Sequence, residues 1–367
     1  MTHAAHALYP DITIAAGPRA YRHIQENGLS PNDIDTVFGA SGAAKWLTIA
    51  GLDSAVFGSF LARRTAHAPI DLYGTSVGAF KLAAAARAEP TKALATMAEA
   101  YIHQDYTDGV THDVIAEETE KILTQVISAE HGGVDEILTN LDYHLHVGAV
   151  RCHGLMNAQS KLKLAAAMTL AGLGAVFTPS HLRGMAERVI FSDPRRHLVF
   201  HATDGFDVRQ SQLSPDNLLD ALKASGSIPV YMPGVYFADD PEHVYHDGGM
   251  LDYHPIPSAF WPTQQGLTLY PHFLDYFKIR WFDKFYKWRK ARGAQLDNVV
   301  MIAPSPRFIA SLPGGKIPDR QDFIKLRHHN QQRIDNWSHV NARSHDLGAQ
   351  FIALAQSGDL AAVVEPL

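Results

Sequence analysis

The chain has 367 residues, of which 46% are hydrophobic and 19% are charged, values typical of a folded globular protein and not of collagen-like or disordered chains. Lys and Arg number 32 against 38 Asp and Glu, so the net charge is −6. This balance lacks the basic excess that a dedicated nucleic-acid-binding protein needs to neutralise phosphates. We therefore expect no nucleic-acid partner.

Two features bear on the compartment. Cys152 is the only cysteine, so the chain cannot form an internal disulfide, which fits a reducing environment. Residues 1–10 contain neither the basic segment nor the apolar run of a signal peptide, and no stretch reaches the roughly 18 apolar residues of a membrane span. These features predict a cytoplasmic protein whose contact with membranes, if it has any, is peripheral.

The first elements alternate between helix and strand patterns. Residues 18–28 begin with Pro and end with Gly, which predicts a short helix. Residues 35–38 are a β-prone run followed by a glycine-rich turn and a helical stretch over 43–64. Residues 70–73 repeat this order, with a turn at 74–78 and then a helix. This rhythm predicts a right-handed βαβ unit with two parallel strands, whose two turns meet at the edge of the sheet where ligands bind.

The middle of the chain carries weaker signals. Residues 91–141 have a largely helical pattern, strands are expected at 144–150 and 198–202, and a helix is expected at 218–224. Together with the first elements, these signals predict a sheet of five or six strands. We find no repeat and no low-complexity linker, which favours one continuous domain with a helical C-terminal extension.

Residues 74–78 read Gly-Thr-Ser-Val-Gly, the G-x-S-x-G pattern of a nucleophile elbow between a strand and a helix. In such an elbow the serine, Ser76, sits on a sharp turn, and Gly74 and Gly78 relieve the crowding on either side. The start of the helix can donate backbone N–H groups, that of Val77 among them, to a developing oxyanion. We predict Ser76 as a nucleophile; the alternative is a structural turn.

The turn after residues 35–38 is also rich in small residues and ends in Lys45. It lacks the second glycine and the hydroxyl residue of a P-loop, and it lacks the third glycine and the acid of a dinucleotide-binding fingerprint. Its N–H groups are expected at the same sheet edge as Ser76, which favours an oxyanion hole over a plain turn. The members of this loop are Gly39, Ala40, Ser41, Gly42 and Ala43.

A serine nucleophile needs a proton acceptor. A histidine downstream is uninformative, because the chain contains 21 histidines. Asp247 is better specified, since Gly248 and Gly249 follow it and allow its carboxylate to approach another loop without steric cost. A partly buried carboxylate with a raised pKa can accept the serine proton and later activate water. Asp-Gly is also a common turn dipeptide, so spacing alone leaves both interpretations open.

In this order, the loop at 39–45, the elbow at 74–79 and the Asp-Gly-Gly turn at 247–249 resemble the motifs of the patatin-like phospholipases. Residues 224–233, small residues followed by prolines and an aromatic residue, resemble a further segment of that family, so the resemblance extends over roughly 35–257. It implies an α/β fold of three layers, with a mostly parallel central sheet flanked by helices.

The resemblance also implies domains and roles. We expect a patatin-like catalytic domain over residues 1–260 and a mainly helical C-terminal extension over 261–367 packed on the same domain. Ser76 is implied as the nucleophile, Asp247 as its sole partner in a Ser-Asp dyad, and the loop at 39–43 as the oxyanion hole. No cofactor is implied, and the substrate is a lipid or another ester. The supporting residues are Gly74, Gly78, Gly248, Gly249 and Lys45.

The sequence departs from the family pattern at two places. The loop keeps one of the three consecutive glycines that usually precede the basic residue, and residues 252–255 read Asp-Tyr-His-Pro where the family has an Asn-x-Pro neighbourhood. Backbone N–H groups survive a change from Gly to Ser or Ala where φ is negative. The departures therefore bear on substrate preference more than on catalysis.

Residues 273–292 combine aromatic residues at helical spacing with a local charge excess. One interpretation is an interfacial helix that contacts anionic lipids, and the other is a surface helix that packs its aromatic side chains onto the core. The aromatic residues are Phe273, Phe277, Trp281, Phe285 and Trp288, and the basic residues include Lys278, Arg280, Lys284, Lys287, Arg289, Lys290 and Arg292. Peripheral membrane contact through this segment follows from the first interpretation.

The sequence as a whole predicts a lipolytic acyl hydrolase that cleaves carboxylic esters of phospholipids or related lipids. One alternative is an α/β-hydrolase-type esterase with a Ser-Asp-His triad, in which His254, His339 or His345 is the base. Another is a lipid-binding or membrane-binding protein with a vestigial dyad. The pairs His144/His146 and His328/His329 lack carboxylates or cysteines at ligand spacing, so we predict no metal site.

Overall fold

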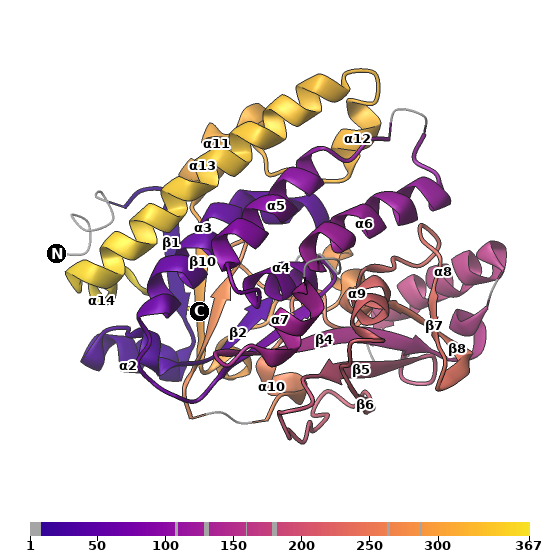
Figure 1. Cartoon of the computed structure of the whole chain (residues 1–367), viewed down its shortest axis with the longest axis horizontal. Coiled ribbons are helices and arrows are strands. Elements are labelled where there is room, and N and C mark those ends of the chain that lie inside the picture. The colour runs from indigo at the N-terminus through magenta and orange to yellow at the C-terminus, as the bar shows by residue number, and fades with distance from the viewer. Residues whose placement is uncertain are drawn as a thin grey trace.

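A computed structural model describes residues 9–106, 109–127, 132–158, 160–177, 182–262, 265–286 and 288–367. These residues form a mostly parallel, mixed sheet flanked by helices (Figure 1). The strands are β1 (Ile12–Ala16), β2 (Ile34–Gly39), β3 (Ile70–Thr75), β4 (Tyr143–Cys152), β5 (Ala186–Ser192), β6 (Val208–Gln212), β7 (Val235–Phe237), β8 (Asp240–Asp247), β9 (Leu267–Pro271), β10 (Val299–Pro304) and β11 (Glu365–Pro366). Their order along the sheet is β11-β1-β10-β9-β2-β3-β4-β5-β6, and β7 and β8 attach to β4.

The helices lie on both sides of this sheet, and most of them, including α3 to α6 and α13, lie above it in Figure 1. They are α2 (Pro18–Asn27), α3 (Ala50–Ala55), α4 (Val77–Ala85), α5 (Pro90–Ile102), α6 (His112–Ile127), α7 (Gly133–Thr139), α8 (Lys161–Phe177), α9 (Leu218–Gly226), α10 (Pro257–Phe260), α11 (Pro306–Ser311), α12 (Gln321–Lys325), α13 (Asn330–Ser357) and α14 (Leu360–Val363). The predicted class, a mostly parallel central sheet flanked by helices, is confirmed.

The predicted βαβ unit is the centre of the fold. Strands β2 and β3 pair in parallel, with Gly39 opposite Gly74 at their carboxyl ends. The helical stretch between them is irregular: a 3₁₀ helix (Ala43–Ile49) leads into α3, and a π-helical turn (Val56–Phe60) follows. Since both strands end at the same edge, the two glycine-rich turns lie side by side.

Two predictions about strands were wrong. Residues 198–202 are not a strand, because their backbone bonds to α10 instead: the His201 N–H donates to the carbonyl of Phe260 at 3.1 Å. The expected count of five or six strands is too low for the described residues. Strand β6 was missed because it has no buried apolar run by which a sequence pattern could reveal it.

The chain beyond residue 260 contributes to the sheet itself. Strands β9 and β10 lie between β1 and β2, so the boundary expected at 260 falls inside one continuous sheet. The helical extension begins later, at α12. Its longest helix, α13, packs so closely on α3 that a Cβ on Gly51 would lie 2.4 Å from the backbone nitrogen of His345.

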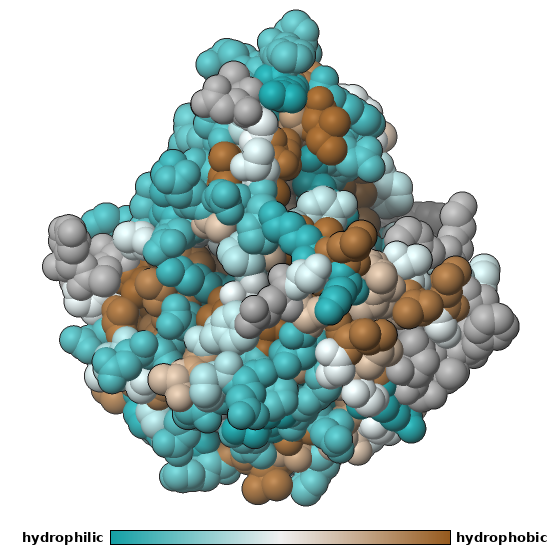
Figure 2. Space-filling model, turned by 90° about the vertical axis from the view of Figure 1, so that its right-hand side faces the viewer, coloured by the Kyte–Doolittle hydropathy of each residue, from teal (hydrophilic) through white to brown (hydrophobic). Residues whose placement is uncertain are grey.

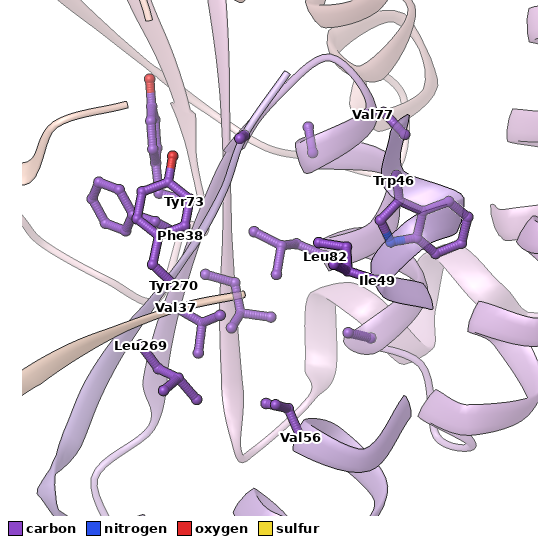
Figure 3. Packing of buried hydrophobic residues seen from close by; sticks show 14 of the residues in the cluster. Val37, Phe38, Trp46, Ile49, Val56, Tyr73, Val77, Leu82, Leu269 and Tyr270 are labelled. Atoms are coloured by element: carbon purple, nitrogen blue, oxygen red, sulfur yellow. The ribbon is translucent and has the colours of Figure 1, made fainter. Parts of the chain in front are cut away.

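Both faces of the central strands are covered by apolar side chains. Figure 3 shows Phe38, Tyr73 and Tyr270 together on one side of β2, β3 and β9, whereas Trp46 and Leu82 lie on the helical side. Strands buried on both faces are typical of parallel sheets between helical layers. This packing fixes the sheet edge from which the two glycine-rich turns project.

Candidate active site

Ser76 occupies a strained turn between β3 and α4. Its φ of 54° and ψ of −132° lie in a region that residues other than glycine rarely adopt, and such strain is typical of functional sites. The elbow packs backbone to backbone on the loop after β2: a Cβ on Gly78 would lie 2.2 Å from the carbonyl oxygen of Gly39. A Cβ on Gly74 would lie 2.5 Å from the carbonyl carbon of Gly78. The glycines of the pattern are therefore sterically required.

The end of α9 holds the elbow in place. The backbone N–H of Ser76 donates to Ser225 Oγ at 2.9 Å, and Ser225 Oγ donates to the carbonyl of Gly148 at 2.6 Å. Ser225 belongs to the small-residue segment at 224–233, whose composition was noted in the sequence without a role for this hydroxyl. It links the elbow to β4.

Asp247 ends β8, where it pairs with Ala149 of β4, and lines the same cavity as Ser76. Its Oδ1 accepts the Gly249 N–H at 2.7 Å. The turn again requires glycine, because a Cβ on Gly248 would lie 2.3 Å from the carbonyl oxygen of Gly148. The structure thus brings together the two predicted members of the dyad from segments 171 residues apart in the chain.

Burial raises the pKa of Asp247 to about 6, against the opposing effects of the Gly249 N–H, the Lys284 charge and the Ser76 hydroxyl. A carboxylate with a pKa near 6 is ionised at neutral pH and still basic enough to accept a proton in a transition state. The electrostatic setting of Asp247 is therefore suited to accepting a proton near neutral pH.

The N–H groups of the glycine loop at 39–43 have different surroundings: one is bonded to the protein backbone, and others lie at the cavity. The Ser41 N–H donates to the carbonyl of Tyr253 at 2.8 Å, so it is not available to an oxyanion. Gly42 and Ala43 line the cavity, and within the described residues no acceptor contacts their N–H groups or that of Val77. Gly39 and Ala40 do not line the cavity; they lie beneath it, where Gly39 and the nitrogen of Ala40 face Gly78.

Two cavities meet at Ser76. The first, of about 240 Å³, is lined by Asp247, by residues 41–43 of the glycine loop and by three basic residues that include Lys45. The second, of about 340 Å³, is mainly apolar; its lining includes Phe80, Tyr101, Tyr106, Ile115, Met232 and Phe323. Ser76 therefore lines both a cavity with several charged residues and a mainly apolar cavity.

The sequence did not reveal all the aromatic and basic residues that line the first cavity. Lys45 was predicted as a supporting residue, and its Nζ lies 3.4 Å from the Tyr253 hydroxyl. Tyr253, Lys284 and Arg320 also line this cavity. The basic excess at 273–292 was the one available signal for Lys284, and it was interpreted as part of a helix.

The predicted helix at 273–292 is wrong. The described residues of this segment contain only a 3₁₀ turn (Trp281–Phe285), and the preceding backbone is extended, with the Tyr253 N–H donating to the carbonyl of Ile279 at 2.8 Å. Phe273 and Phe277 are only 1% exposed. These two aromatic side chains pack onto the core, as the second interpretation held, and the described residues of the segment form no amphipathic helical face for an interfacial role.

The histidines considered for a triad lie elsewhere. His254 is fully buried, its Nδ1 accepts the Lys278 N–H at 2.9 Å, and burial lowers its pKa well below the usual value. His339 and His345 are exposed on α13. Among the described residues, no histidine lines either cavity at Ser76.

The described part of the chain contains no group of three side chains suited to hold a metal ion. His146 Nε2 contacts Asp71 Oδ1 at 3.2 Å, and His144 Nδ1 lies 3.7 Å from the same oxygen. Asp71 also pairs with Arg196, whose Nη2 lies 3.0 Å from its Oδ2. We interpret this cluster as a buried ion-pair network.

A mostly parallel α/β sheet with a serine elbow at the end of a central strand defines a class of hydrolase-like proteins. Within that class, a family model for patatin-like phospholipase matches residues 68–260, more than half of the chain. The chain belongs to the patatin-like phospholipase family, which comprises lipid acyl hydrolases. The match includes the elbow and the Asp-Gly-Gly turn but begins after the loop at 39–45.

The other comparisons returned nothing: no curated protein and no solved structure matches the chain significantly. With regard to membranes, none of the helices in the described ranges combines the length and the apolar character needed to cross a bilayer.

Proposed function

We propose that this protein is a lipolytic acyl hydrolase that cleaves carboxylic esters through a Ser76-Asp247 dyad. The observation that carries the proposal is the shared cavity: Ser76 on its strained elbow and a buried Asp247 with a pKa of about 6 line the same space. A hydroxyl nucleophile beside a carboxylate tuned near neutrality is suited to acyl transfer without a histidine.

In the proposed reaction, Ser76 Oγ attacks the ester carbonyl while its proton passes to Asp247. The N–H groups of Gly42, Ala43 and Val77 stabilise the tetrahedral oxyanion. The intermediate collapses, the bond from the carbonyl carbon to the alcohol oxygen breaks, and Asp247 returns the proton to the leaving alcohol. Asp247 then takes a proton from water, which attacks the carbonyl carbon of the acyl-serine. The bond from that carbon to Ser76 Oγ breaks, Asp247 returns the proton to Ser76, and the carboxylic acid is released.

The apolar cavity supports a lipid substrate. Side chains such as Phe80, Met232 and Phe323 line a space next to Ser76 that suits an acyl chain, because burial of each methylene contributes about 0.8 kcal/mol. A phospholipid, a lysophospholipid and a smaller ester each present such a chain.

The cytoplasmic location also belongs to this proposal, and it rests on the lone, buried Cys152.

Labelling with a fluorophosphonate tests the proposal, because this probe forms a covalent bond only with an activated serine. We expect wild type to be labelled at Ser76 and Ser76→Ala to remain unlabelled. Ser357→Ala, which removes an exposed serine of α13, is the matched control and should label normally. An unlabelled wild-type protein that still binds lipid would favour the vestigial-dyad alternative.

The triad alternative is tested separately by substitution of His254, His339 and His345. The dyad predicts that each His→Ala variant that folds keeps its ester hydrolysis. A loss of about 10³-fold or more in one of them, with Asp247→Asn active, would establish a triad instead.

A further inference from the structure

We propose that the 340 Å³ cavity beside Ser76 holds an acyl chain that carries an oxygen function, a hydroxyl or an oxo group, bound by Tyr101 and Gln104. This inference rests on the proposed function and deepens it, because it names the class of acyl group. The lining of the cavity is mainly apolar, which suits the hydrocarbon part of such a chain. Three buried polar side chains in the same lining have no use for a plain hydrocarbon.

These polar side chains come from the end of α5 and from the loop that follows it. Tyr101, Gln104 and Tyr106 line the cavity and are only 8%, 5% and 7% exposed. Arg320 and Lys325, which also line the cavity, are instead exposed to solvent. The polar cluster therefore belongs to the interior, where a hydrogen-bonding group without a partner is costly.

Hydrogen bonds within the protein satisfy part of this cluster. The Tyr106 hydroxyl donates to Gln104 Oε1 at 2.8 Å, and Gln104 Nε2 donates to the backbone carbonyl of Tyr101 at 3.0 Å. These bonds fix the orientation of the amide, because an amide turned by 180° would set its oxygen against that carbonyl. An amide nitrogen carries two N–H groups, and the second one of Gln104 has no acceptor within the described residues.

The Tyr101 hydroxyl is the second free donor. In the described part of the chain no residue is hydrogen-bonded to it, although the ring is held edge-on against Trp46 with the centroids 6.2 Å apart. Burial raises the pKa of Tyr101, and the nearby Tyr106 and Asp247 act in the same direction. The phenol therefore keeps its proton at neutral pH, and it lies near enough to the proposed dyad to be affected by the charge of Asp247.

The cavity is open to solvent on one side. Val110, Tyr231 and Ile324 line it and are exposed, and they lie before α6, after α9 and on α12. Helices α6 and α12 lie toward the right of Figure 1, and Figure 2, which faces that side, shows hydrophobic residues exposed among hydrophilic ones. An acyl chain can thus enter from the surface and reach the buried cluster in a cavity that Ser76 also lines.

A hydrocarbon chain and an oxygenated chain differ in what they offer to the two free donors. A hydrocarbon chain would exclude water from Tyr101 and Gln104 and leave both without a hydrogen bond, which weakens binding. An oxygen on the chain accepts a hydrogen bond from these donors. A site that hydrogen-bonds a substrate oxygen rejects the analogue that lacks it. The substrate class is therefore an ester of a hydroxy acid or an oxo acid.

A series of esters of one alcohol tests this proposal. One ester carries an unsubstituted acyl chain, and the others carry one hydroxyl or oxo group at successive carbons of the same chain. For wild type we expect at least one oxygenated ester to have a kcat/KM about 10-fold higher than that of the unsubstituted ester. Tyr101→Phe should lower kcat/KM for that oxygenated ester and raise it for the unsubstituted ester, because the variant lacks the unpaired hydroxyl.

Two further variants sharpen the measurement. Gln104→Met removes the other donor at similar volume and should reduce the same ratio of kcat/KM values. Tyr236→Phe is the matched control, because Tyr236 is exposed on β7 and lines neither cavity at Ser76, so this variant should keep the wild-type ratio. If Tyr101→Phe lowers kcat/KM equally for both esters, Tyr101 has only a structural role and the inference is overturned.

The remaining outcomes separate this inference from the proposed function. If wild type reacts with the fluorophosphonate and hydrolyses the unsubstituted ester best, the inference is overturned and the hydrolase stands. If no ester is hydrolysed and no serine is labelled, the proposed function fails and the inference falls with it. A gain from an oxygen on the alcohol part that is lost in Tyr101→Phe would place the alcohol in this cavity, which also overturns the inference.

Discussion

The two walls of the catalytic cavity are built in different ways. The first wall consists of three turns, at 39–43, 74–78 and 247–249, whose backbones lie against one another so closely that no Cβ fits at several positions. The second wall consists of long side chains from Tyr253, Lys284 and Arg320. A wall of touching backbones tolerates almost no change, whereas a wall of flexible side chains can vary in chemistry without moving the nucleophile.

This difference suggests that the two walls have different roles. The backbone wall carries Ser76 and Asp247, the two groups of the proposed dyad, and lies at the edge of a sheet that is buried on both faces. The side-chain wall carries charge, and its members come from the 3₁₀ turn at 281–285 and from the residue before α12. We expect substitutions in the first wall to affect turnover or folding, and substitutions in the second wall to affect the choice of substrate.

The largest effect is expected for Ser76→Ala. Ester hydrolysis should fall by at least about 10³-fold, because the variant retains the oxyanion hole but has no nucleophile. The melting temperature should stay close to that of wild type, since the strain of the elbow lies in its backbone. Hydrolysis above a tenth of the wild-type rate would exclude Ser76 as the nucleophile.

Asp247→Asn is expected to be nearly as damaging, at about 10²-fold or more, because an amide cannot accept the serine proton. In wild type, kcat/KM should fall tenfold per pH unit below about pH 6, where Asp247 becomes protonated. The pH profile of a water-soluble ester measures this directly. A profile that is flat from pH 5 to 8 would contradict the role of Asp247 as the base.

Gly78→Ala tests the backbone wall. The new Cβ would lie 2.2 Å from the carbonyl oxygen of Gly39, so the free energy of unfolding should fall by about 1–3 kcal/mol or more. Gly172→Ala is the matched control: its Cβ would meet Phe282 at an ordinary 3.7 Å within α8. That variant should gain about 0.5–1 kcal/mol, because alanine has the higher helix propensity. Urea unfolding of both variants provides the comparison.

The difference in stability between Asp247→Asn and wild type should depend on pH, because only wild type carries the titrating carboxyl. The folded pKa of about 6 lies above the ordinary aspartate value of 3.8, so the folded state holds this proton more tightly than the unfolded state. Asp247 therefore favours folding below about pH 4, and this contribution is lost as the pH rises through 6. The asparagine variant should gain up to about 3 kcal/mol over wild type at pH 8 and little at pH 4. Urea titrations at the two pH values would show an equal difference if this were wrong.

The smallest effect is expected for the exposed histidines of α13. His339→Ala and His345→Ala should change kcat/KM by less than about twofold, because neither residue lines a cavity at Ser76. Steady-state hydrolysis of a soluble ester is sufficient to measure this. A large loss in either variant would mean that α13 acts on the catalytic cavity.

Several features could be predicted from the sequence because local contacts determine them. The elbow at 74–78 was recognisable because its glycines are required by neighbours within a few residues or by the adjacent turn. The parallel pairing of β2 with β3 followed from the length of the helical connection between them. The family resemblance rested on the same turns, which is why the fold class and the family could both be predicted.

Other features were decided only by the tertiary structure. Residues 273–292 have helical spacing, yet the backbone at 279 bonds to Tyr253 and the aromatic side chains fill the core, so long-range packing overrides the local pattern. Strands β9 and β10 enter the middle of the sheet from a region that the sequence assigned to an extension.

The cationic wall shows the physical reason most clearly. A glycine that must fit against another backbone leaves a mark in the sequence, because no other residue can replace it there. A lysine whose long and flexible side chain reaches a cavity cannot be recognised in this way, because its local sequence does not differ from that of a lysine on any other exposed turn. The sequence by itself therefore determined the fold class and the strained turns of the elbow, and only the packing of segments 239 and 275 residues apart placed Lys284 and Arg320 in the same cavity as Lys45.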